Sequence, residues 1–253
     1  MHQAQSYIQR FVLPSAPGLA PSVLALTASF AAGMQQTLKA DAVGYCYSGT
    51  VSIADGIRGI DSGFFTWATI KLYYATFYLA RALLAVRGAC IFYDGRTPFR
   101  WLSNAGQVAK KLKGNTHHVV LDEFKALGFF PLFLGQQIDN LEPLDWLRIR
   151  RETANYASPR FTEPDPPDHL ERISSMGVRR VAEAYLSDKT RLYVFDSDHA
   201  MLAYPIELLK QTIQEINGLV GSQSLNHADR TFLAAICKDA AGPLPGVRRL
   251  LLS

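Results

Sequence analysis

The sequence predicts a mainly α-helical bundle with a small β-hairpin insertion. Apolar residues recur at helical spacing along most of the chain, whereas only two short segments, on either side of Asp94-Gly95, have the pattern of a hairpin. A strand content this low excludes an alternating α/β fold. With 253 residues, 48% of them hydrophobic, the chain is long enough to bury a substantial core.

Three regions are expected along the chain. Residues 1–21 are predicted to form an extended arm, because prolines at 14, 17 and 21 disfavour helix at the residues before them. Residues 22–220 are predicted to form the helical domain, and residues 221–253 a C-terminal helix and tail.

The first half of the helical domain contains its strongest element. Ser22 is predicted to cap a helix that ends at Gly44, and the segment 45–62, rich in Gly, Ser and Asp, is predicted to be a loop. The helix 64–87 is apolar on nearly all faces, so we expect it at the centre of the bundle. Two charged residues inside it, Lys71 and Arg81, argue against a membrane span.

The later elements are predicted from caps, glycines and prolines. In the hairpin, Pro98 would confine the second arm to a sheet edge. Further helices are predicted at 104–113, 119–127 and 144–156, followed by a proline-rich spacer at 158–168 and a segment with helical spacing at 169–186. Pro205 is predicted to begin an amphipathic helix, and Asn226 to cap a last helix that Gly242-Pro243 ends.

Composition and motif content narrow the class of protein. The net charge of +4 is compatible with an anionic partner. Cys46, Cys90 and Cys237 lie far apart without a CxxC pair, which indicates reduced core cysteines in a cytoplasmic protein. The chain has no GxSxG elbow, no Walker loop and no GxGxxG motif after a strand, so no cofactor is expected.

The helix 144–156 carries the first candidate site. Arg148, Arg151 and Asn155 are spaced i, i+3, i+7 and share one face. The two guanidinium groups would form a cationic fork suited to phosphate oxygens, and Asn155 would add donors. The alternative is a solvated basic face on which Glu152 pairs with a neighbouring arginine.

A second basic group lies earlier in the chain. Lys110, Lys111 and Lys113 precede Gly114, and they suit either a helix C-terminus or a surface that binds phosphates. His117 and His118 follow directly and would assist such a surface.

A third candidate is the run Asp196-Ser197-Asp198-His199. Two carboxylates and an imidazole could ligate a divalent metal, which would indicate a metal-dependent hydrolase centred on Asp198 and His199. The alternative is that Asp196 or Ser197 caps the next helix, with His199 packed beneath it.

Two runs resemble the signatures of one superfamily. Tyr73-Tyr74-Ala75-Thr76-Phe77-Tyr78-Leu79-Ala80-Arg81-Ala82-Leu83 resembles the long helix of HEPN-domain proteins, which often reads Tyr-Tyr-Ala-x-Phe-x-x-Ala-Arg-Ala-Leu. The run Arg150-Arg151-Glu152-Thr153-Ala154-Asn155-Tyr156 is similar to the second signature, an Arg and a His separated by four to six residues. The resemblance covers residues 22–220. It implies a helical bundle that usually dimerises, often in prokaryotic defence systems or toxin–antitoxin pairs.

The resemblance also implies a chemistry. In active members, the Arg and His of two protomers meet and cleave RNA without a metal, with Arg stabilising charge and His moving a proton. Arg151 matches the arginine, but Tyr156 stands in the histidine position. A tyrosine, with a pKa of about 10, is a poor base at pH 7.

We therefore expect an RNA- or partner-binding protein that is cytoplasmic, not bound to a membrane, and either a homodimer or a subunit of a larger assembly. Arg151 and Tyr156 would occupy the catalytic positions, and the arginine face and the lysines would contact RNA. The first alternative is a metal-independent endoribonuclease in which Arg151 acts with Tyr156 or with another residue such as His118. The second alternative is the metal-dependent hydrolase.

Overall fold

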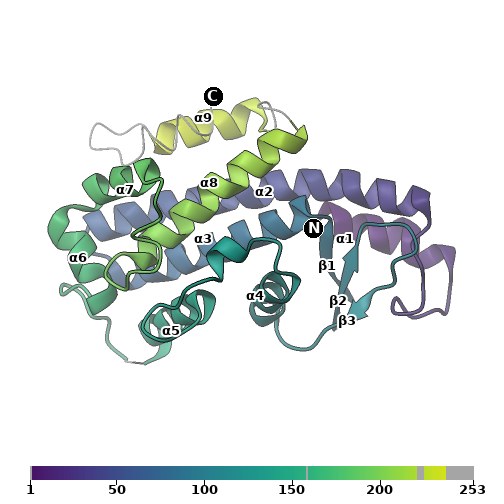
Figure 1. Cartoon of the computed structure of the whole chain (residues 1–253), viewed down its shortest axis with the longest axis horizontal. Helices are drawn as coiled ribbons and strands as arrows, with labels where there is room; N and C mark the ends of the chain where they lie inside the picture. The colour runs from purple at the N-terminus through teal and green to yellow at the C-terminus, as the bar shows by residue number, and fades with distance from the viewer. Residues whose placement is uncertain (1, 158, 221–224, 238–253) are drawn as a thin grey trace.

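The computed structural model describes residues 2–157, 159–220 and 225–237, which are mainly α-helical with a small antiparallel sheet, as predicted (Figure 1). The described α-helices are α1 (Gln3–Tyr7), α2 (Ala28–Asp61), α3 (Phe65–Val86), α4 (Thr116–Leu127), α5 (Pro143–Tyr156), α6 (Asp168–Met176), α7 (Val178–Ser187), α8 (Ala200–Val220) and α9 (His227–Ile236). The described strands are β1 (Ala89–Asp94), β2 (Thr97–Leu102) and β3 (Lys110–Lys111). Within this part of the chain, no helix combines the length and the apolar character needed to cross a lipid bilayer.

The long helices α2 and α3 form the centre of the bundle and pack against each other along their length (Figure 1). The helix α8 packs against both, and α9 packs against α2. As predicted, α3 is buried on nearly all faces. Glycines on α2 permit the close approach, because a Cβ at Gly49 or Gly56 would lie 2.7 Å from the Cγ atom of Leu79 or Leu72.

The helix α2 is much longer than predicted, and the predicted loop at 45–62 is wrong. Thr27 rather than Ser22 caps this helix, and its hydroxyl accepts a hydrogen bond from the Phe30 N–H at 3.2 Å. The small residues that suggested a loop lie inside the helix instead. Glycine permits close helix packing there, and Ser52 donates a hydrogen bond to the Ser48 carbonyl at 2.8 Å, four residues earlier.

The prediction of an extended N-terminal arm is also wrong, because α1 continues into a π-helical turn and then a 3-10 turn that ends at Ser15. Ala4, Ile8 and Val12 recur every four residues and are buried in the core. The carboxylate of Asp41 on α2 accepts hydrogen bonds from the N–H groups of Gln3 and Ala4 at 2.8 and 2.9 Å. A proline at 14 fits this segment because it stands in the first turn of the 3-10 helix.

The predicted hairpin is present as β1 and β2, and β3 extends it into a sheet of order β1-β2-β3. Because β2 is the middle strand, the prediction that it lies at an edge is wrong. Pro98 is tolerated because it lies near the start of β2, and β3 pairs only with Phe99 and Arg100. The predicted helix at 104–113 is wrong too, since a turn and β3 occupy that segment.

Local caps set the ends of several later helices. The Asn115 side chain caps α4 by accepting a hydrogen bond from the His118 N–H at 3.1 Å, and Gly128 ends α4 with a left-handed φ of 57°. The segment 169–186 is helical but divided, since Gly177 separates α6 from α7 with a φ of 84°.

The last described helices differ from prediction in one boundary. Pro205 lies inside α8 rather than at its start, because the Asp196 carbonyl accepts the N–H of Ala200 at 2.6 Å and begins the helix earlier. Asn226 caps α9 as predicted, accepting the Asp229 N–H at 2.8 Å. The predicted helix end at 242–243 lies outside the described residues.

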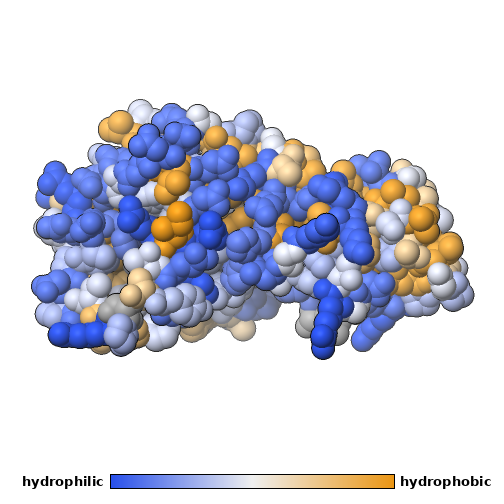
Figure 2. All heavy atoms as spheres, turned by 90° about the horizontal axis from the view of Figure 1, so that it is seen from below, coloured by the Kyte–Doolittle hydropathy of each residue, from blue (hydrophilic) through white to orange (hydrophobic). Residues whose placement is uncertain are grey.

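The surface seen from below is mostly hydrophilic, but apolar side chains gather at the end of the molecule that carries the N-terminal segment (Figures 1 and 2). That segment includes the exposed apolar residues Phe11, Leu19 and Val23. The candidate arginines and the neighbouring histidines lie elsewhere, on α5 and α4.

Candidate functional site

The arginines of α5 differ in whether they form ion pairs with carboxylates. Arg148 Nη1 lies 3.2 Å from Glu152 Oε2, and its Nη2 lies 3.5 Å from Asp145 Oδ1. Arg150 Nη2 lies 3.3 Å from Asp139 Oδ2. The local pairing with Glu152 that the sequence left open is therefore present. The charges of these two arginines are already balanced by carboxylates.

Arg151 has a different environment. Within the described residues it forms no ion pair, and its polar contact is the Tyr74 hydroxyl, 3.5 Å from Nη2. Its Cζ atom lies 5.7, 5.8 and 5.6 Å from the ring centroids of Tyr73, Tyr74 and Tyr156, within the range of cation–π attraction. Its Nε–H is buried without a hydrogen-bond partner among the described residues. The predicted fork is therefore a single available guanidinium, held by aromatic rings.

Tyr156 is 71% exposed at the end of α5. Its ring packs against the Arg151 guanidinium on one side and leaves the rest of its surface open. Asn155 is half-buried, and its side chain forms no hydrogen bond within the part of the chain that the structure describes. The site thus pairs one available cation with one exposed aromatic surface.

An imidazole reaches this site from α4. The ring centroid of His117 lies 4.4 Å from that of Phe77 and 5.2 Å from that of Tyr74. Its Nδ1 lies 3.5 Å from the Tyr73 hydroxyl. Burial, followed by the positive charge of Arg151, lowers the pKa of His117 from its usual value, which favours the neutral imidazole. Burial also raises the pKa of Tyr73 to about 12, which keeps its phenol protonated.

His118, rather than His117, is the residue predicted from the sequence to replace the missing proton-transfer group. His118 is exposed and does not join the cluster. Helical spacing contains the signal that distinguishes them, because His117 is four and seven residues before the buried Leu121 and Phe124. His118 shares its side of α4 with the exposed Asp122.

The structure does not bring the predicted lysine surface to Arg151. Lys110 Nζ lies 2.9 Å from Oε1 of the buried Glu123, whose other oxygen pairs with Arg100 at 3.1 Å. Lys111 and Lys113 are exposed. The strand β3 and the helix α5 lie apart, with α4 between them (Figure 1). Because these lysines precede no helix end, the helix C-terminus alternative is wrong as well.

The run Asp196-Ser197-Asp198-His199 agrees with the alternative prediction, in which Asp196 or Ser197 caps the next helix and His199 packs beneath it. Asp196 Oδ1 accepts the Asp198 N–H at 2.9 Å, and His199 is buried with its Nδ1 2.6 Å from the Tyr185 hydroxyl. Among the described residues, no group of three or more His, Cys, Asp or Glu side chains is arranged to hold a metal. The metal-dependent hydrolase therefore lacks a ligand set in this part of the chain.

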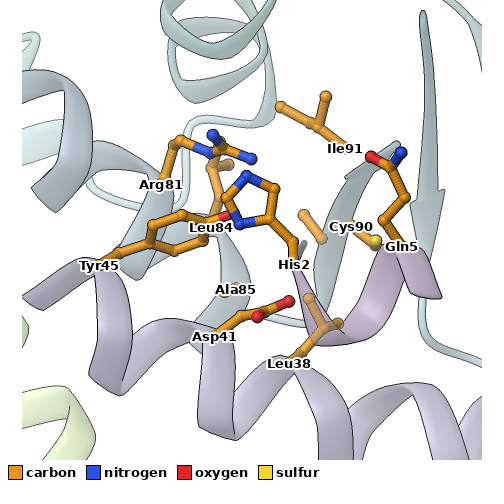
Figure 3. Close-up of a pocket in the computed structure, with 11 residues that line it drawn as sticks. His2, Gln5, Leu38, Asp41, Tyr45, Arg81, Leu84, Ala85, Cys90 and Ile91 are labelled. Carbon is orange, nitrogen blue, oxygen red and sulfur yellow. The ribbon is translucent and has the colours of Figure 1, made fainter. Parts of the chain in front are cut away.

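A small pocket lies where α1, α2, α3 and β1 meet (Figure 3). The guanidinium of Arg81 lies 4.4 Å from the ring centroid of Tyr45, and the His2 ring lies 5.1 Å from the same ring. Asp41 also faces this pocket, but its oxygens are taken by the N-terminus of α1. Arg81 therefore resembles Arg151, because its guanidinium also forms no ion pair within the described residues.

Comparison of the chain with protein-family models, with curated proteins and with solved structures finds no match. The basis for a function is therefore the geometry itself. That geometry is one available guanidinium, an exposed tyrosine and an imidazole on two helices, α5 and α4, that both pack against α3.

Proposed function

We propose that this chain is a HEPN-like protein that binds RNA at Arg151, Tyr74, Tyr156 and His117, here called the arginine–tyrosine site. The observation that carries the proposal is the contrast on α5, where Arg148 and Arg150 have carboxylate partners and Arg151 has none among the described residues. A planar guanidinium with available donors binds a phosphate through two parallel hydrogen bonds.

The surroundings of Arg151 favour a nucleic acid over an acidic protein segment. The tyrosine rings hold the guanidinium in one place, so little side-chain entropy is lost when a phosphate binds. The exposed ring of Tyr156 offers a surface on which an unpaired base can stack next to that phosphate. An acidic peptide would use the charge but not the stacking surface.

The test compares two arginines on the same helix. We expect Arg151→Ala to weaken binding of a fluorescently labelled, unstructured RNA at least about tenfold by anisotropy. The slope of log affinity against log salt should also fall by about 0.7, the value for one lost phosphate contact on a single strand. Arg148→Ala is the matched control, and its effect should be small because Glu152 and Asp145 already balance its charge. Equal effects of the two substitutions, or no RNA binding by the parent protein, would refute the proposal.

A second candidate function is metal-independent RNA cleavage, which the position of His117 favours. A neutral imidazole can accept a proton from an RNA 2′-hydroxyl, while Arg151 stabilises the charge that develops on the phosphate. Our expectation for the isolated protein is binding with little or no cleavage. Cleavage in the presence of EDTA that His117→Asn abolishes and His118→Asn retains would replace that expectation with an active nuclease.

We also propose, from the resemblance, that the chain works as a homodimer or as a subunit of a larger prokaryotic defence or toxin-type assembly. Light scattering coupled to size-exclusion chromatography measures the first of these. A molar mass equal to one chain would exclude the homodimer.

A further inference from the structure

The central helix α3 has one uncovered stripe. Between Phe65 and Ala85, every residue of α3 is buried except five, namely Trp67, Lys71, Tyr74, Tyr78 and Arg81. These five are spaced i, i+4, i+7, i+11 and i+14, so they share one side of the helix. We call them the α3 stripe.

Neighbouring helices border the α3 stripe on both sides. On one side, α2 packs closely through Gly49 and Gly56. On the other side, α4 and α5 contact α3 and place His117 and Arg151 against the ring of Tyr74. The stripe therefore passes directly through the arginine–tyrosine site and continues beyond it in both directions.

At one end of the stripe, Trp67 is 51% exposed, and its ring meets that of the exposed Phe161 edge-to-face at 6.0 Å. Lys71 lies one turn further on and forms an exposed ion pair with Asp55 at 3.3 Å. The surface is hollowed here, in a pocket between the end of α2 and the start of α3 that includes Trp67 and Lys71. Exposed pairs of this kind contribute little to stability, so Lys71 can exchange its partner for a phosphate.

At the other end, Arg81 points into the pocket between α1 and α2 (Figure 3). It lies over the ring of Tyr45, and Tyr78 precedes it by one turn. Each end of the stripe therefore has a cation, Lys71 or Arg81, and aromatic rings lie between these two cations.

The composition of the stripe identifies its occupant. An aromatic row at helical spacing is usually core, but these are the residues that the core leaves uncovered. Trp, Tyr and Arg are also enriched at protein–protein interfaces, but lysine is depleted there, and Lys71, Arg151 and Arg81 place cations at intervals along the rings of this stripe. Proteins that hold single-stranded nucleic acids combine aromatic rings, on which bases stack, with cations that follow the backbone.

We propose that a single strand of RNA lies along the α3 stripe, with bases stacked on Trp67, Tyr74 and Tyr78 and phosphates at Lys71, Arg151 and Arg81. This inference rests on the proposed RNA binding and adds the substrate class, an unpaired strand rather than a duplex. A duplex keeps its bases stacked on each other and cannot use the rings. Trp67 to Arg81 spans about 21 Å at ~1.5 Å per residue, or about six stacked nucleotides at ~3.4 Å each.

Trp67 provides a direct signal in the unmodified protein. Trp101 and Trp146 are fully buried, so quenching of tryptophan fluorescence by added RNA reports on Trp67. We expect single-stranded oligonucleotides to quench this fluorescence, with affinity that rises with length up to about six nucleotides and then levels off. A duplex of the same sequence should neither quench nor compete. Quenching by the duplex with equal affinity, or RNA binding without quenching, would overturn the proposal.

Variants test the two ends of the stripe. Trp67→Ala should weaken single-strand binding about 5- to 100-fold, the range for loss of one base–aromatic stack. Leu192→Ala, an exposed apolar residue outside the stripe, is its control. Arg81→Gln should weaken binding and reduce the salt slope. Arg87→Gln, at an arginine that pairs with Glu215, should do neither.

The outcomes separate this inference from the proposal on which it rests. If Arg151→Ala weakens RNA binding but Trp67→Ala and Arg81→Gln do not, the arginine–tyrosine site stands and the strand path is wrong. If the parent protein binds no RNA, both fail. The competing occupant is a second copy of this chain. A change of molar mass in Trp67→Ala, with unchanged RNA affinity, would assign the stripe to that contact instead.

Discussion

Acid sensitivity of the bundle is expected to depend on one buried histidine on α6. His169 is buried, its Nε2 lies 2.9 Å from the Thr69 hydroxyl on α3, and its ring meets Trp146 of α5 edge-to-face. Burial, followed by the positive charge of Arg150, lowers the pKa of His169 from 6.5 to about 3. Protonation of this imidazole therefore opposes the packing of three helices.

The size and sign of the change in the free energy of unfolding follow from the linkage between protonation and folding. Between pH 6.5 and pH 3, the unfolded chain binds a proton at His169 and the folded chain does not. The free energy of unfolding therefore falls as the pH decreases through this range, while the contribution is fully present above pH 6.5. A pKa difference of 3.5, at about 1.4 kcal/mol for each pKa unit, gives a total loss of about 5 kcal/mol once the pH is below 3. That loss is comparable to the total stability of many domains.

The assay is urea unfolding at a series of pH values, followed by circular dichroism, for the parent and for His169→Gln. Glutamine keeps a hydrogen-bonding group near Thr69 but cannot titrate. We expect the variant to lose less stability between pH 7 and pH 4 than the parent. His118→Gln, at an exposed histidine, should retain the parental dependence. Parallel curves for His169→Gln and the parent would refute the assignment.

Three further predictions concern the core, the helix contact and the site. Phe77→Ala should reduce the free energy of unfolding by about 3–5 kcal/mol, measured by urea unfolding, because the buried ring leaves a cavity. An unchanged transition would show that α3 is not central. Gly56→Ala should destabilise by about 1–3 kcal/mol in the same assay because its Cβ would meet Leu72. Gly44→Ala on the same helix has open space and should stabilise by about 0.5–1 kcal/mol, so the opposite order would contradict the packing. Tyr156→Phe should retain RNA affinity in anisotropy titrations and Tyr156→Ala should reduce it, and equal affinities would remove the ring from the site.

Much of the fold could be predicted from the sequence where a local signal coincides with the tertiary environment. The helix α3 and the β1–β2 hairpin follow from apolar periodicity and a two-residue turn. The cap of α9 at Asn226 follows from its side-chain chemistry. The helix α2 could not be predicted in full, because its glycines and serines have low helix propensity and are stabilised by contacts with α3 that no local window contains.

The candidate site could be predicted only in part, for a related reason. The spacing of residues on one helix identifies Arg151 as a candidate. That it has no carboxylate partner among the described residues depends on the ion pairs that Arg148 and Arg150 form with the neighbouring carboxylates. The approach of His117 depends on the packing of α4 against α3, and residues on different helices leave no shared period in the sequence. A motif search along α5 therefore finds the arginine and not its imidazole neighbour.

The α3 stripe also has a consequence for how α3 tolerates mutation. If RNA lies along the α3 stripe as proposed, the helix serves two purposes that alternate every three or four residues, a core on most of its sides and a ligand surface on one. In a scan of all substitutions along α3, cellular abundance should fall at positions such as Leu72 and Leu79. At Trp67 and Arg81, abundance should persist while RNA binding weakens. The two sets of positions would then form two interleaved helical periods within a single segment of sequence.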